Sequence, residues 1–457
     1  MFFCGGQKIA RRKLPNRTKR LLKTVVYAGI AAFFHAAAAL ASDSETRLLD
    51  TLVERGVLSS AEALDIKKSN AAQPEISPAA QTSRIRLFNF IHARYQYSKQ
   101  TYSSGESFEK NGFAVRRLIP VVLADVSQNS KIQVSLFFPS RAPLNASHYE
   151  YNVDTEYLSG KFWLGYETAF FCMEEPESGT RIMTPDRSIL NMYFGGGDHG
   201  FYGGNSTSYS TPLAFSGYHT GVFWNGNLAK NKSVIYRFAV TNSKAEKVGF
   251  GGDNGYAFWT ALGIDKSEGT NRLRLGVNGG YSTRVVSAVS EASVPSPVAD
   301  FGDAWGVNPY MLLRRGAFSL DAEFMVVALQ YGSSTDSERA HYSTSSKQAT
   351  PWGFYVLAAY KFDIPPFGQF EPVFRYLHLD TDGRGVTEGA VLYRTENRGG
   401  LFDKIDAFYA GVNWYVLGNN LKYTFCVEYA DFNGGVSGGE DRNSGTLLAM
   451  IQVQIVF

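Results

Sequence analysis

Apolar and polar residues alternate along the last segment of the chain, residues 446–457. One face of this segment is apolar and consists of Leu447, Ala449, Ile451, Val453, Ile455 and Phe457. Gln452 and Gln454 lie on the opposite face. A strand with one apolar and one polar face must place the apolar face against a nonpolar phase. A membrane-spanning barrel and an ordinary β-sandwich both satisfy this pattern, so the segment alone leaves both open.

The same alternation continues from residue 84 to residue 457, where the pattern predicts about 16 strands and no helix of any length. The clearest strands are 84–98, 131–138, 160–171, 231–241, 271–281, 317–328, 369–379, 404–415, 421–430 and 446–457. Weaker candidates are 113–126, 148–157, 217–224, 255–264, 304–313 and 352–362. The spacing of roughly 23 residues per strand suits spans of ~9–11 residues joined by alternating short and long loops. The expected fold is therefore all-β, a transmembrane antiparallel β-barrel over residues 84–457.

The first 41 residues have the pattern of a signal peptide. A basic stretch without acidic residues precedes an apolar run, residues 24–38, and the small-residue cleavage motif Ala39-Leu40-Ala41. This order is typical of Sec-type export, and together with a barrel it predicts the bacterial outer membrane. An uncleaved membrane anchor is the alternative, but the apolar run is short for one. Cleavage removes eight basic residues, which leaves 37 Lys and Arg against 42 Asp and Glu and gives no indication of nucleic-acid binding.

A short helical segment is expected between the signal peptide and the barrel, at residues 42–83. Leu48, Leu49, Leu52 and Val53 share one helical face before Gly56, and residues 59–62 form a capping box for a second helix. A polar linker with two prolines follows at 70–82. This periplasmic leader either packs against the barrel or a sister subunit, or is solvated.

The composition agrees with a barrel without proving one. The chain has 33 Phe, 26 Tyr, 6 Trp and 45 Gly, which aromatic girdles and tight turns would use. Cys4 leaves with the signal peptide, and Cys172 and Cys426 remain. Two cysteines are too few for a disulfide-stabilised scaffold, and both a single bridge and two free thiols stay open.

One predicted connection, residues 173–217, is far longer than the others. Loops of this length are commonly functional, and in a barrel such a loop can fold inward and narrow the channel. We favour the inward fold over a loop on the outside. The charged residues expected at this constriction are Glu167, Glu174, Glu175, Arg181 and Arg187. Because acidic residues outnumber basic ones here, the narrowest point need not be positive.

Charged side chains on the polar faces are the candidate pore lining. The first strand places four basic residues on one face, namely Arg84, Arg86, His92 and Arg94. Other strands add Lys131, Arg237, Arg272, Arg274 and Arg375. Fixed positive charges in a narrow channel favour anions. For any single residue, a solvated charge paired with a nearby carboxylate is the more common alternative, but the cluster on the first strand favours a lumen role.

Enzyme and metal motifs are weak. Residues 435–439 match G-x-S-x-G but lack the strand-then-helix context that exposes such a serine. Residues 380–383 resemble the start of a calcium loop without the later ligands, so a turn is expected. The histidines show no metal-binding spacing; they include His148, His199, His219, His341 and His378. We therefore expect no catalytic residue, no metal site and no cofactor.

Several short motifs together resemble the phosphate-selective porin O and P family. They are the leader at 48–63, Gly112-Phe-Ala-Val-Arg-Arg117, the stretch 161–170, Asp186-Arg187-Ser188, and the strands at 220–226 and 236–242. The resemblance implies a 16-stranded porin that forms a homotrimer. The chain departs from the family pattern at Glu167, where Lys is common, and at residues 168–169, where a Pro-bearing step is common.

The expected function is an outer-membrane porin that lets small hydrophilic solutes or ions diffuse through a water-filled channel, with at most a weak preference for anions. Its expected partners are outer-membrane lipid, sister subunits and the barrel-assembly machinery, because a last strand that ends at Phe457 resembles the assembly signal of outer-membrane barrels. The main alternative is a structural or adhesive barrel without a transport role. A barrel enzyme is a third possibility that no catalytic constellation supports.

Overall fold

The computed structural model describes residues 84–138, 144–195, 213, 215–228, 232–243, 255–283, 301–331, 348–392, 402–435 and 443–457. All of them belong to one compact unit, Thr82–Phe457. The predicted signal peptide and leader lie outside the described residues. In the part of the chain that is described, no helix is long and apolar enough to cross a membrane.

Within the described residues, eighteen strands form a single sheet, and two short helices lie in its connections. The strands in the first half are β1 (Ile85–Tyr102), β2 (Ser107–Asp125), β3 (Ser130–Leu136), β4 (Leu144–Asp154), β5 (Leu158–Thr168), β6 (Tyr218–Leu228), β7 (Val234–Asn242), β8 (Tyr256–Glu268) and β9 (Asn271–Ser282). Those in the second half are β10 (Phe301–Arg315), β11 (Phe318–Tyr331), β12 (Gln348–Ala349), β13 (Trp352–Tyr360), β14 (Phe362–Ile364), β15 (Gly368–Asp380), β16 (Phe402–Tyr415), β17 (Leu421–Gly435) and β18 (Ser444–Val456). The helices are α3 (Ile189–Gly195) and α5 (Glu388–Val391).

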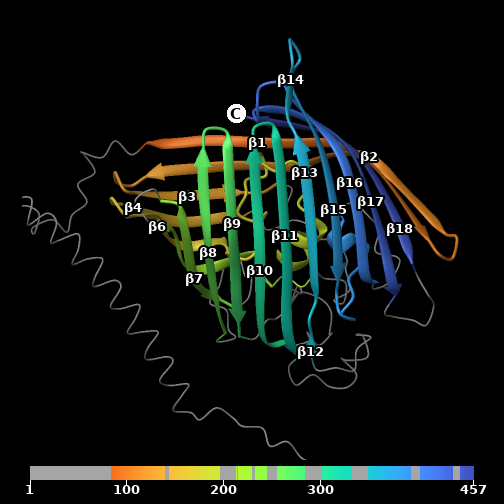
Figure 1. The fold of residues 1–457 in the computed structure, drawn as a ribbon, viewed down its shortest axis with the longest axis horizontal. Helices are drawn as coiled ribbons and strands as arrows, with labels where there is room; N and C mark the ends of the chain where they lie inside the picture. The colour runs from red at the N-terminus through yellow and green to blue at the C-terminus, as the bar shows by residue number, and fades with distance from the viewer. Residues whose placement is uncertain are drawn as a thin grey trace, which may run out of the picture. The chain divides into compact units, whose positions relative to one another are not determined.

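The sheet closes on itself, because β1 pairs with β2 on one side and with β18 on the other. Every ladder between neighbouring strands is antiparallel, and Figure 1 shows the strands side by side around the barrel. β12, β13 and β14 are successive pieces of one crossing, since β12 and β13 pair with β11 while β13 and β14 pair with β15. The barrel therefore has 16 crossings, which confirms the predicted fold, and each predicted strand overlaps one crossing.

The alternation of side chains along each strand separates an inner from an outer face. On β1, the even-numbered residues from 90 to 102 are buried, while their odd-numbered neighbours are more exposed. The inner face includes His92, Arg94 and Gln96. The outer face carries exposed apolar side chains around the barrel, for example Leu87, Leu164, Leu262, Phe374, Phe408, Val427 and Ile451. Such an apolar exterior is what a lipid-facing wall requires.

Short turns gather at one end of the barrel and long connections at the other. The turns between β2 and β3, β8 and β9, and β10 and β11 span only a few residues, whereas β5 and β6 are separated by residues 169–217. The chain's C-terminus lies at the short-turn end, where the backbone groups of Phe457 exchange hydrogen bonds of 2.7 and 3.0 Å with Asn89. In Figure 1 this end is at the top.

A β-bulge interrupts the ladder between β1 and β2. Arg117 lies opposite His92 and Val115 lies opposite Ala93, so Arg116 is an extra residue on β2. A bulge of this kind re-aims side chains that strict alternation would place on opposite faces. Both Arg116 and Arg117 are consequently buried, with 1% of each side chain exposed.

The wall between β4 and β7 depends on glycines at points of close backbone approach. A Cβ on Gly165 would lie 2.3 Å from the carbonyl oxygen of Ser147, and the φ of +143° at Gly165 is one that other residues rarely adopt. This spacing leaves no room for a side chain.

We expect Gly165→Ala to destabilise the folded barrel by about 1–3 kcal/mol, because overpacking of a close contact costs that much. The measurement is the temperature at which the barrel loses its compact, heat-modifiable band in gel electrophoresis. Gly279→Ala is the matched control, since its Cβ would lie 3.3 Å from the Thr260 methyl group and 3.9 Å from the carbonyl oxygen of Gly306, without a backbone clash. Equal transition temperatures for the two variants would show that the contact at Gly165 is not limiting.

Candidate functional site: the lumen around the inner loop

The described part of the connection between β5 and β6 lies inside the barrel. We call residues 169–217 the inner loop; residues 169–195, 213 and 215–217 of it are described. Its helix α3 is completely buried, and its apolar side chains belong to the same cluster as inner residues of β11, β15 and β16.

Polar side chains of the wall hold the backbone of the inner loop. Asn278 of β9 donates to the carbonyl of Phe171 at 2.8 Å, and Glu323 of β11 accepts from the N–H of Met173. Further donors are Asn413 to Met183, Lys422 to Ile182 and Gln454 to Thr180. The loop therefore spans the lumen with its backbone groups satisfied from several sides, as buried backbone requires.

Asp186 anchors the loop to the wall formed by β1 and β2. Its carboxylate accepts a hydrogen bond from Arg94 at 2.6 Å and one from Arg116 at 2.8 Å, and Arg117 lies 3.9 Å away. Burial alone would raise the pKa of Asp186, but the positive charges of Arg116, Arg94 and Arg117 outweigh it and lower the pKa well below its usual value. Asp186 therefore stays ionised into acidic solution.

The bulge explains why sequence reasoning missed two of these arginines. Strict alternation would place only one of Arg116 and Arg117 inside the barrel. The two side chains were therefore not expected to lie in the lumen together. The sequence signal was the Arg-Arg pair in the family-like motif at 112–117. Lys422 of β17, Arg314 of β10 and Asp265 of β8 were also missed.

The acidic residues at the start of the inner loop are turned toward the loop itself. Glu174 accepts hydrogen bonds from the N–H of Ser188, at 2.8 Å, and from its hydroxyl group. Arg187 donates to the carbonyls of Glu174, Glu175 and residue 177. Within the Asp186-Arg187-Ser188 segment, Arg187 and Ser188 therefore bond to the loop itself, whereas Asp186 binds the barrel wall.

Arg375 of β15 pairs with an inner-face carboxylate and also approaches the loop. Its guanidinium lies 2.9 Å from Glu428 of β17 and 3.8 Å from Glu174. Its charge is therefore shared between two carboxylates.

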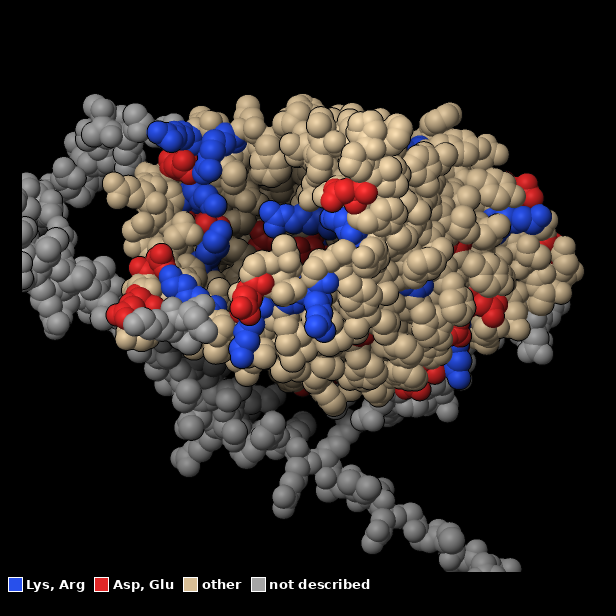
Figure 2. Space-filling model, turned by 45° about the horizontal axis from the view of Figure 1, so that its top comes forward, with Lys and Arg blue, Asp and Glu red and all other residues tan. Residues whose placement is uncertain are grey.

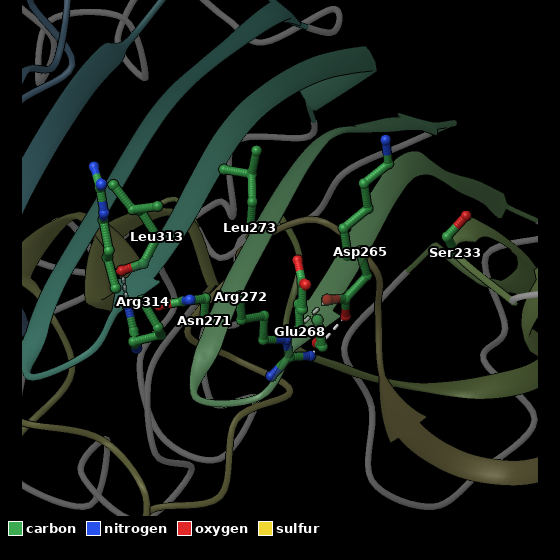
Figure 3. A pocket seen from close by; sticks show the side chains of 11 residues that line it. Ser233, Asp265, Glu268, Asn271, Arg272, Leu273, Leu313 and Arg314 are labelled. Carbon is green, nitrogen blue, oxygen red and sulfur yellow. Dashed lines mark hydrogen bonds and ion pairs between the residues drawn. The ribbon is translucent and has the colours of Figure 1, made fainter.

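A second basic group lies on the wall from β7 to β10. Asp265 accepts hydrogen bonds from both Arg272 and Arg274, and Figure 3 shows Arg272 directed at Asp265 at the short-turn ends of these strands. Arg314 pairs with Asp321 of β11. The guanidinium of Arg237 lies 5.6 Å from the ring centre of Phe170.

A pocket of about 190 Å³ separates this wall from the inner loop. The lining residues from the loop include Glu174, Glu177 and Arg181, and those from the wall include Arg272, Arg314 and Asp321. Of the charged side chains that line the pocket from the loop, Arg181 is therefore exposed, Glu177 is partly exposed and Glu174 is buried.

The remaining residues named from the sequence lie apart from this pocket. Glu167 pairs with His148 at 2.9 Å, and Lys131 pairs with Glu150 at 3.1 Å. Arg86 is exposed and pairs with Asp125 at the short-turn end, next to Arg84. Of the four basic residues expected along the first strand, only His92 and Arg94 are buried against the lumen contents.

Figure 2 shows a hollow in the molecule with Lys and Arg side chains on both of its sides and acidic side chains within it. β9 is eight strands from β1 in the closed order, so the two arginine groups lie half a barrel apart. Basic side chains therefore face the inner loop from two opposite sides of the barrel.

Other sequence motifs are structural or lie outside the described residues. Residues 380–383 form a turn in which the N–H of Asp382 bonds to the Asp380 side chain at 2.9 Å. Residues 436–439 of the G-x-S-x-G match are not described. No group of three or more potential metal-ligating side chains occurs within the described ranges, and Cys172 and Cys426 are both buried free thiols.

Comparison with known proteins agrees with this architecture. A family model for phosphate-selective porin O and P matches residues 145–457, more than half of the chain. The anion-selective porin from Comamonas acidovorans is 10% identical with a TM-score of 0.51, and the similarity covers 82% of this chain and 100% of that one. It supports the barrel fold.

Two other solved structures are more distant. The outer-membrane channel DcaP of Acinetobacter baumannii is 12% identical with a TM-score of 0.45, over 81% of this chain and 97% of that one. OprB of Pseudomonas putida is 9% identical with a TM-score of 0.47, over 82% and 94%. The search of curated proteins found no match. With the family model matched over residues 145–457 and the barrel closed in 16 crossings, the chain belongs to the phosphate-selective porin O and P family and is an outer-membrane channel protein.

Proposed function

We propose that this porin is a passive diffusion channel for small hydrophilic solutes with a weak preference for anions. The observation that carries the proposal is the excess of basic over acidic side chains on the two walls that face the inner loop. Arg94, Arg116 and Arg117 all lie within ion-pair distance of the carboxylate of Asp186. Fixed positive charge along a narrow aqueous path attracts anions and repels cations.

The charge on the second wall, from β7 to β10, also favours anions. Arg272 and Arg274 share the carboxylate of Asp265, and Arg237 has no carboxylate within ion-pair distance among the described residues. The net charge of this group is therefore positive.

The acidic residues that could oppose this preference are largely occupied. Glu167 accepts hydrogen bonds from the N–H and the hydroxyl group of Thr168, and Glu174 accepts from Ser188 and is buried. These contacts partly compensate the negative charge of the two carboxylates. The carboxylates therefore weaken the preference of the channel for anions without abolishing it. Because Glu167 stands where the family commonly has Lys, we propose a general anion preference rather than phosphate specificity.

The same proposal extends to export, assembly and subunit number. The signal-like residues 1–41 support Sec-type export, and Phe457 at the end of the closing strand supports recognition by the barrel-assembly machinery. The family supports a homotrimer. We further propose that the protein has no enzymatic activity, since the polar side chains of the lumen form ion pairs and loop contacts rather than a nucleophile with a base.

The rival function is a structural or adhesive barrel with no transport role. Reconstitution of the purified protein in a planar bilayer separates the two functions. Discrete conductance steps support the channel, and their absence from folded protein would favour the rival. In a salt gradient, the sign of the reversal potential then gives the selectivity.

Loss of positive charge on β9 and gain of positive charge on β5 should move the reversal potential in opposite directions. We expect Arg272→Gln with Arg274→Gln to shift selectivity toward cations and Glu167→Lys to shift it toward anions. A unit charge ~8 Å away in water changes the energy of an anion by about 0.5 kcal/mol and that of a cation by about as much in the opposite sense, so the anion-to-cation permeability ratio should change by up to roughly sixfold per unit charge, and by less where salt screens the charge. Arg84→Gln with Arg86→Gln, at the barrel mouth, should have a smaller effect. An unchanged reversal potential in both wall variants would contradict the proposed location of the selective region.

Removal of the charge on Asp186 should loosen the inner loop and strengthen anion preference. In Asp186→Asn, three arginines lose their shared anion, so we expect noisier single-channel currents and a higher anion-to-cation ratio. Because the pKa of Asp186 is lowered in the folded protein, the stability that its ion pairs give the inner loop is present above about pH 3.9. This stability is lost only as the pH falls through the lower folded pKa. The difference from wild type should therefore be the same at pH 5 and pH 8. Asp154→Asn, at an exposed turn, is the control.

Deletion of Phe457 should reduce the amount of assembled protein far more than the conductance of each channel. The residue closes β18 against β1 by two backbone hydrogen bonds, and its ring is exposed for recognition. The measurement is the amount of heat-modifiable barrel in outer-membrane fractions, compared with Phe457→Tyr, which keeps an aromatic terminus. Wild-type levels of the deletion variant would refute the role assigned to this residue.

A further inference from the structure

A second connection enters the barrel beside the inner loop. Residues 381–392, which we call the second loop, follow β15 and contain α5. Val386, Val391 and Leu392 are buried in the same apolar cluster as Tyr193 and Phe194 of α3. α5 packs against α3, so the second loop adds to the material inside the long-loop half of the lumen.

One carboxylate ties the second loop to the barrel wall. Glu388 is 1% exposed, and one of its carboxylate oxygens accepts hydrogen bonds from Gln100 and, at 2.8 Å, from the hydroxyl group of Tyr102 on β1. The other oxygen accepts from Ser444 and, at 3.1 Å, from Thr446 on β18. The anchor therefore lies on the two strands that close the barrel.

All four donors to Glu388 are neutral. The charged groups near the second loop bind elsewhere: Asp403 of β16 accepts from Thr381 and from the N–H of residue 383, and Arg384 lies against the ring of Tyr193 of α3. Among the described residues, the one titratable group that bonds to the carboxylate from another element is the Tyr102 hydroxyl. Glu388 is thus a buried acid held by hydrogen bonds alone, without a cation at its carboxylate among the described contacts, an arrangement in which the charged form is costly.

Burial raises the pKa of Glu388, and the bonds from Ser444, Tyr102, Thr446 and Gln100 lower it by less, so the pKa lies above its ordinary value. A group whose pKa is raised in the docked state binds its proton more tightly there than in the undocked state. Docking is therefore most favourable at low pH and weakens as the pH rises through the raised value.

We infer that the second loop is a second constricting segment of the channel and that Glu388 is the positioning residue that docks it, more firmly as the pH falls. The lumen would then have two inserted segments with different responses to pH. The inner loop keeps its ionised Asp186 anchor, whereas the second loop is held by an acid that takes up a proton. Acidic solution would narrow the long-loop half of the channel.

The test is single-channel conductance of the full-length protein in planar bilayers at pH 5 to 8. We expect the wild-type conductance to rise with pH, with a midpoint above about 4.3, the ordinary value for glutamate. Glu388→Gln mimics the protonated acid and should give a low conductance independent of pH. Glu388→Ala lacks the anchor and should give a high conductance independent of pH. Glu106→Gln, an exposed acid in the turn after β1, should behave as wild type.

A second readout does not depend on conductance. Val391 is 3% exposed in the docked loop, so a cysteine at this position should react slowly with a membrane-impermeant thiol reagent at pH 5 and faster when Glu388→Ala is added. The parent protein for this measurement lacks Cys172 and Cys426. Heat-modifiable mobility verifies that each variant is folded.

The inference is overturned if Glu388→Gln keeps the wild-type pH response, or if folded Glu388→Ala matches wild type in both conductance and thiol reactivity. The proposed anion preference is judged separately, by the sign of the reversal potential, which neither result determines.

Discussion

The closed ladder of backbone hydrogen bonds is the constraint on which the rest of the structure depends. A strand in contact with lipid has no water to satisfy its N–H and C=O groups, so an open edge would be costly. Pairing of β1 with β18, up to the last residue of the chain, removes that edge. Once closure is imposed, alternate residues must face lipid and lumen, and the chemistry of the interior follows from which residues occupy the inner positions.

A barrel of 16 crossings encloses more space than its own inward side chains fill. In this protein the additional volume is occupied by two connections that turn inward, and the wall supplies the polar partners that their backbones and carboxylates need. Apolar packing between α3, α5 and the inner wall adds to these bonds. The channel is thus the space that remains once the polar groups of the two connections have found partners on the wall and their apolar side chains have packed together.

The sequence predicted the barrel well because alternation with period two is a local property that each strand carries by itself. Even the weakest candidates, such as 304–313 and 352–362, fall on observed crossings. The position of charges was harder to predict, because it depends on pairs far apart in the chain. Arg94 could be placed on an inner face, but its partner Asp186 is 92 residues away in a loop without periodicity. The basic residues at 84 and 86 share the face of Arg94 and still lie at the mouth, because alternation gives the side of a strand but not the depth along it.

The bulge at Arg116 has a consequence for how such a wall can change over time. In a regular strand, loss or gain of one residue exchanges the lipid and lumen faces of everything beyond it, which a membrane protein cannot tolerate. The extra residue on β2 does not take part in the alternation of faces. Without it, Val115 would still oppose Ala93 and Arg117 would still oppose His92. A single-residue deletion at this point would remove one lumen charge and leave the two faces of the strand intact. The bulge therefore makes the number of charges on this wall a variable that evolution can adjust one residue at a time.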